Sequence, residues 1–175
     1  MADLRAEMKR SGRIYLSKSR LVLHYFFVPF LLVLPWLLTV LAKPAFNNAW
    51  PTVNADADLW ALAAGILLSG LYALRQYKSL KLASVSLQIT DEHLKSELHK
   101  LAERMHWILE YSAEDVVIYS TEFKWTNWGT MIYILRSEDK VSYKSICDLH
   151  NRPSTFSRGD NARNMCALEA MLKQL

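Results

Sequence analysis

Two long apolar stretches lie in the first half of the chain. Residues 21–42 and 59–74 contain no Lys, Arg, Asp or Glu. At about 1.5 Å per residue, the first makes a helix about 33 Å long, enough to cross a hydrocarbon core about 30 Å thick. The second reaches a spanning length as a helix over residues 58–77. The pattern predicts a transmembrane hairpin over residues 21–77, with an external loop over residues 43–57.

A secretory signal peptide is the alternative for the first stretch, because Val40-Leu41-Ala42 ends in small residues. Its apolar run is longer than the usual apolar region of about 7–15 residues, and a second apolar stretch follows it. Pro29 and Pro35 are expected to bend this helix. The length and the second stretch favour a membrane span.

Small side chains recur at every fourth position of the second span. They are Ala57, Ala61, Gly65, Ser69 and Ala73. This spacing forms a stripe that lets another helix approach closely. We interpret the stripe either as the face that packs on the first span or as a docking face for a protein partner or a second copy.

Basic residues flank the hairpin on one side of the predicted membrane. Those before the first span are Arg5, Lys9, Arg10, Arg13, Lys18 and Arg20, and those after the second are Arg75, Lys78 and Lys81. Residues 44–57, between the spans, contain none. The excess of Lys and Arg in cytoplasmic flanks predicts a multi-pass membrane protein with both termini in the cytoplasm.

Residues 1–20 are predicted to be a basic cytosolic N-terminal segment. Leu4, Met8 and the cluster Ile14–Leu16 lie among its basic groups. The segment is either an amphipathic helix on the headgroup surface or a plain orientation signal.

Residues 83–175 have the polar and apolar mixture of a small cytosolic domain. Alternating apolar residues predict strands, and they are Val85-Leu87-Ile89, Val117-Tyr119, Met131-Tyr133-Leu135 and Val141-Tyr143. Met165, Leu168, Leu172 and Leu175 fall on one face of a predicted final helix. The pattern predicts an α+β domain closed by a C-terminal helix.

Residues 90–110 fit two structures. Leu94, Leu98, Leu101, Met105 and Ile108 have the spacing of an amphipathic helix. The run Ile89–Leu94 fits equally a hairpin that joins two strands. Counting the pattern favours the helix, and the architecture described next favours strands.

The order of parts resembles bacterial YcxB-like membrane proteins, which carry a pleckstrin-homology-like domain. The stretches that carry the resemblance are Val85–Leu94, Trp107–Val116, Lys140–Ile146 and the final helix from Asn161. The resemblance implies a protein of a bacterial inner membrane, with two spans and a cytosolic antiparallel sheet closed by one helix. It also implies a binding or scaffolding module rather than an enzyme.

One Glu-x-x-His match gives the only candidate metal ligands. On a helix, Glu92, His99, Glu103 and His106 would share one face. A solvated polar face opposite the leucines explains the same pattern, and no second Glu-x-x-His supplies further ligands. No metal or other cofactor is predicted.

Aromatic residues gather at one predicted turn around Asn127 and Gly129. Phe123, Lys124, Trp125 and Trp128 form this cluster. They either close the edge of the sheet or form a contact surface for lipid headgroups or a protein partner.

Composition narrows the function. The chain has 175 residues and a net charge of +4, and the basic excess lies within residues 1–20. This excludes a basic nucleic-acid-binding body, and two cysteines exclude a disulfide scaffold. No motif for a small-molecule substrate is present. We expect a non-enzymatic, membrane-anchored interaction module that binds lipid and a protein partner or a second copy.

Two other functions remain open from the sequence. A membrane-anchored immunity protein that neutralises a toxin at the inner membrane would have the same size and organisation. A metal-dependent membrane enzyme would use the Glu92, His99, Glu103 and His106 face.

Overall fold

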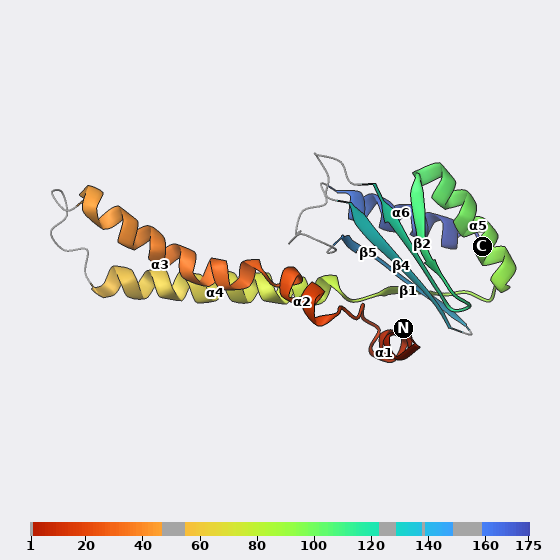
Figure 1. The fold of residues 1–175 in the computed structure, drawn as a ribbon, viewed down its shortest axis with the longest axis horizontal. Helices are drawn as coiled ribbons and strands as arrows, with labels where there is room; N and C mark the ends of the chain where they lie inside the picture. The colour runs from red at the N-terminus through yellow and green to blue at the C-terminus, as the bar shows by residue number, and fades with distance from the viewer. Residues whose placement is uncertain (1, 47–54, 123–128, 138, 149–158) are drawn as a thin grey trace.

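The structure, a computed structural model, describes residues 2–46, 55–122, 129–137, 139–148 and 159–175. A helical hairpin forms one end of the elongated molecule, and a sheet with its covering helices forms the other (Figure 1). The chain starts beside the sheet, runs out and back through the hairpin, and ends in a helix against the sheet (Figure 1).

The first apolar stretch forms two helices, whereas the sequence predicted one helix over residues 21–42. They are α2 (Lys18–His24) and α3 (Phe27–Phe46). Pro29 causes the break, because it has no N–H to donate to the carbonyl of Tyr25 four residues earlier. That carbonyl instead accepts a hydrogen bond from the N–H of Val28 at 2.9 Å.

The return helix α4 (Ala55–Ser79) lies against α3 (Figure 1). Both sides of the hairpin are long and apolar enough to cross a membrane, over Lys18–Leu41 and Asp58–Ser79. In the most apolar 18-residue stretch of each side, only 6% and 17% of the residues are buried. These helices therefore do not lie inside a folded core. Helix α3 continues to Phe46, which shortens the connection predicted over residues 43–57.

The strands form one antiparallel sheet in the order β1-β5-β4-β3-β2. They are β1 (Ala83–Ser86), β2 (Trp107–Ser112), β3 (Val116–Thr121), β4 (Thr130–Ser137) and β5 (Lys140–Cys147). The first six residues of β4 are all buried. Since alternate residues of a strand face opposite sides, both faces of the sheet are covered.

Helix α5 (Asp91–Met105) joins β1 to β2 and confirms the helical interpretation over its own length, whereas Ile108, the last residue of the predicted helical pattern, lies in β2. Its leucines Leu94, Leu98 and Leu101 are buried against the sheet. The strand interpretation of this region is wrong, because the helical period of these leucines places them on one packed face. The preceding strand also ends earlier than its alternation predicted, at Ser86.

Helix α6 (Asp160–Leu172) lies beside α5 on the same face of the sheet (Figure 1). Leu168, Met171 and Leu172 enter the core, whereas Leu175 is 36% exposed beyond the helix end. An antiparallel sheet with a C-terminal helix is therefore present, as the sequence predicted.

The opposite face of the sheet is covered by residues that precede the hairpin in the sequence and by residues that follow it. Helix α1 (Ala2–Ser11) contributes Met8, and the following segment contributes Ile14 and Leu16. Leu80 and Leu82, from the connection between α4 and β1, complete the cover. We call the sheet, these segments, α5 and α6 together the sheet domain.

The N-terminal segment begins with a helix, but its buried apolar residues pack on the sheet, which corrects the expectation that they lie on the headgroup surface. Its role as an orientation signal stays a prediction. Met8, Ile14 and Leu16 lie in the sheet domain's core, whereas Tyr15 is exposed, and Lys9 forms an ion pair with Asp115 at 2.8 Å. The physical reason is that the second face of the sheet is apolar and must be removed from water.

This packing predicts that Ile14→Ala destabilises the sheet domain by about 2–4 kcal/mol, because Ile14 is 3% exposed. The matched control is Tyr15→Ala, at a neighbour that is 51% exposed, with an expected change near 0.5 kcal/mol. Denaturant titration in detergent, followed by circular dichroism, measures both. Equal effects of the two substitutions would show that the segment is not part of the core.

Candidate functional site

Two segments pair where the hairpin meets the sheet domain. The N–H of Ile14 donates to the carbonyl of Leu80 at 2.9 Å, and the N–H of Leu82 donates to the carbonyl of Gly12 at 3.0 Å. The chain entering the hairpin is thus bonded through its backbone to the chain leaving it. We call this pairing the clip.

Arg13 strengthens the clip from within. Its guanidinium donates to the carbonyl of Tyr77 at 2.8 Å and lies 3.6 Å from the centroid of the Tyr77 ring. This stacking is a cation–π contact. The last turn of α4 is therefore held by the segment that precedes α2.

A polar cluster joins α2 to α4 at the same end of the hairpin. His24 is 5% exposed, and its Nε2 lies 3.1 Å from the carbonyl oxygen of Gln76. The Gln76 amide donates to the Tyr72 hydroxyl at 2.6 Å, and the Ser79 hydroxyl donates to the Gln76 carbonyl at 2.7 Å. These bonds fix the base of the hairpin in one arrangement.

Strand β5 extends past its neighbour β1 at this junction. The pairing of β1 ends with Ala83 opposite Tyr143, because Leu82 turns away to join the clip. Residues 144–147 of β5 therefore extend beyond the β1 pairing. The N–H of Ser145 donates to the sulfur of Met165 at 3.3 Å, a weak acceptor.

A cavity of about 290 Å³ lies at the end of β5 that extends past β1. Its walls come from α2, the last turn of α4, the end of β5 and the start of α6. The polar residues that line it are His24, Arg75, Gln76, Ser79, Lys144, Ser145 and Asn161. We call it the junction cavity.

Two basic side chains give the junction cavity its charge. Arg75 is exposed and Lys144 is half-buried. Burial lowers the pKa of Lys144 below its ordinary value. No Asp or Glu is among the described residues that line the cavity.

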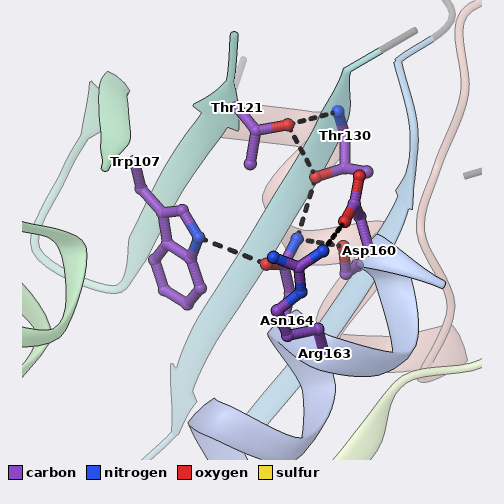
Figure 2. A network of polar contacts seen from close by, with 7 residues as sticks. Trp107, Thr121, Thr130, Asp160, Arg163 and Asn164 are labelled. Carbon is purple, nitrogen blue, oxygen red and sulfur yellow. Dashed lines mark hydrogen bonds and ion pairs between the residues drawn. The ribbon is translucent and has the colours of Figure 1, made fainter. Parts of the chain in front are cut away.

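A buried network positions the wall formed by α6 (Figure 2). The Trp107 indole N–H donates to Oδ1 of the Asn164 side chain at 3.3 Å. The side-chain Nδ2 of Asn164 donates to the hydroxyl of Thr130 at 2.9 Å. The Ser145 hydroxyl donates to Oδ1 of Asn161 at 2.8 Å. The start of α6 is thereby tied to β2, β4 and β5.

The structure places the small-residue stripe against α3. Ala61 and Ser69 are 9% and 7% exposed. A Cβ on Gly65 would lie 2.3 Å from the carbonyl oxygen of Leu32. Ala73 is half-buried in the same helix, and the side chain of Ala57 lies outside the described residues. The described stripe is thus the contact between the two sides of the hairpin.

The predicted basic residues have separate roles. Lys9 pairs with Asp115, Arg10 pairs with Glu7, and Arg13 forms part of the clip. Arg20 forms a hydrogen bond with Tyr133 that opposes the rise in the Tyr133 pKa caused by burial. Lys18 is exposed, and the side chain of Arg5 lies outside the described residues.

The metal candidates do not form a ligand cluster. His99 and Glu103 lie 3.3 Å apart on the exposed face of α5, whereas His106 ends that helix with a φ of 55°. Glu92 is exposed in its first turn. Within the described ranges, no group of three or more His, Cys, Asp or Glu residues is placed to hold a metal.

The predicted aromatic cluster cannot be placed. Phe123, Lys124, Trp125 and Trp128 lie outside the described residues. The junction cavity was not predicted from the sequence, since its lining residues come from separate segments spread between residues 24 and 162. The local signals were His24 in an apolar run and Lys144 beside Ser145 in an alternating strand.

The stripe contact predicts that Gly65→Ala weakens the hairpin by about 1–3 kcal/mol, because the new methyl group would meet backbone. Gly70→Ala is the control, since a Cβ there meets nothing within 4 Å. Titration of the helical circular-dichroism signal with sodium dodecyl sulfate measures the difference. If both variants lose structure at the same detergent fraction, the close approach of α3 and α4 is wrong.

Comparisons with known proteins assign no family to this chain. No protein-family model matches it, and neither does a curated protein or a solved structure. The resemblance to YcxB-like proteins stays a prediction. A functional proposal for this chain therefore rests on the residues where the hairpin meets the sheet domain.

Proposed function

We propose that this chain is a non-enzymatic accessory module of a bacterial inner membrane. In this proposal the hairpin spans the membrane and both termini lie in the cytoplasm. The sheet domain then lies at the cytoplasmic face, where it docks a membrane lipid or a protein partner.

The clip is the observation that carries this proposal. The connection from α4 to β1 is not a free tether, because Leu80 and Leu82 are 7% and 8% exposed and pack in the sheet domain's core. Arg13 and the backbone pairing hold the other chain segment at the same place. A domain fixed in this way keeps one orientation relative to the hairpin. The same surface of the sheet domain then always lies next to the membrane, where it can bind a ligand.

The distribution of charge supports the orientation. Arg20 and Lys18 stand at the start of α2, and Arg75 and Lys78 stand in the last turns of α4. The start of α2 and the last turns of α4 form the end of the hairpin that adjoins the sheet domain (Figure 1). Cytoplasmic flanks of membrane spans carry such basic residues. The exposed apolar side chains of the hairpin, such as Trp60 and Leu67, would then face lipid.

The proposal predicts that the protein stays in membranes washed with sodium carbonate. A green fluorescent protein fused after Leu175 should be fluorescent, and an alkaline phosphatase fused there should be inactive. A phosphatase inserted between α3 and α4 serves as the control and should be active. Release of the protein by the wash, or an active C-terminal phosphatase, would contradict the proposal.

The docking part is tested in the same membranes. Chemical crosslinking before extraction in mild detergent should yield a species heavier than the monomer, or a monomer with retained lipid, on mass analysis. A monomer without lipid, found both with and without crosslinking, would contradict a docking role. It would not affect the conclusion about membrane topology.

A further inference from the structure

We infer that the junction cavity binds the phosphate group of an anionic ligand, and that a membrane phospholipid is its natural source. This inference rests on the proposed membrane location and names the ligand class of the docking module. Inorganic phosphate or a soluble phosphate compound offers the same chemistry.

The first argument is depth. The uncharged run of α4 ends at Leu74, and the α4 residues that line the cavity, Arg75, Gln76 and Ser79, follow it directly. A spanning helix whose apolar run ends at Leu74 places the next turn in the headgroup layer. The cavity is therefore at the level where lipid phosphates lie.

The second argument is charge. Lys144 and Arg75 approach the cavity from different elements, β5 and α4. Burial lowers the pKa of Lys144, and no carboxylate among the described lining residues supplies a counter-charge. An anion in the cavity would neutralise both groups, and its hydrogen bonds to Arg75 and Lys144 would be charge-assisted.

The third argument is the wall formed by α6. Gly159 is the N-cap, and it has no side chain to bind the first N–H groups of the helix. The Asp160 carboxylate is paired with Arg163 (Figure 2). Helix N-termini carry a partial positive charge that favours anions. This end of α6 therefore adds to the field of Lys144 and Arg75.

Size agrees with a headgroup. The volume of about 290 Å³ is near the lower limit of small-molecule sites, which span about 300–1,000 Å³. It admits a phosphate with a glycerol-sized substituent, while the acyl chains of a lipid would remain outside along the apolar hairpin.

The test uses the full chain in a neutral maltoside detergent. Short-chain phosphatidylglycerol is titrated in, and the melting temperature is followed as a saturable rise. Short-chain phosphatidylcholine and inorganic phosphate are titrated in parallel. We expect saturation with phosphatidylglycerol, and little rise with phosphatidylcholine.

Two pairs of variants with matched charge changes locate the site. Lys144→Gln should raise the half-saturating concentration of phosphatidylglycerol about tenfold or more, whereas Lys140→Gln in the same strand should not. Arg75→Gln should do the same, and Lys78→Gln, one turn further along α4, should not. A cooperative melting transition of each variant without ligand shows that the variant is folded.

The outcomes separate the sources. If inorganic phosphate saturates through Lys144 and phosphatidylglycerol does not, the phosphate site stands and the lipid source is overturned. If Lys144→Gln and Lys140→Gln titrate alike, the cavity is not the site and the inference fails. That failure is independent of the proposed function, because carbonate resistance and fusion topology are measured without the cavity.

Discussion

The second apolar face of the sheet is the constraint on which the rest of the structure depends. Helices α5 and α6 cover one face, and β4 is buried from both sides, so the other face also needs a cover. That cover comes from Met8, Ile14 and Leu16 before the hairpin and from Leu80 and Leu82 after it. Closing one apolar core therefore also fixes the base of the hairpin.

The junction cavity follows from this constraint. The chain that leaves α4 must first pair with Gly12 through Leu82, and only then can it enter β1 at Ala83. Strand β1 is consequently too short to cover the end of β5, and Lys144 is left beside α4. The residues that attach the hairpin to the sheet thus also create the junction cavity between the hairpin and the sheet.

Patterns within one element were predictable from the sequence, whereas pairings between distant elements were not. The leucine period of α5, the alternation in β3 to β5 and the apolar stretches of the hairpin are local signals, and each corresponds to an observed element. The break at Tyr25 was signalled by Pro29, although a single helix was predicted.

The place of the N-terminal segment has no local signal. The same apolar residues among basic groups suit a lipid surface or a protein core, and only the uncovered face of a sheet more than 100 residues later decides between them. The candidate site shares this limit. Lys144 and Asn161 become cavity residues because α4 reaches them, and no spacing within the sequence encodes that contact.

The hairpin also affects how the sheet domain folds. Arg13 and Tyr77 are 64 positions apart, and closing a flexible loop of that length costs conformational entropy. Packing of α3 on α4 through Gly65 holds the two ends of this loop close together, so the hairpin and the clip share the cost of closing it. A change that loosens α3 from α4 therefore also weakens the cover of the sheet's second face. Stability of the hairpin and stability of the sheet domain are coupled through the clip, although their cores share no residue.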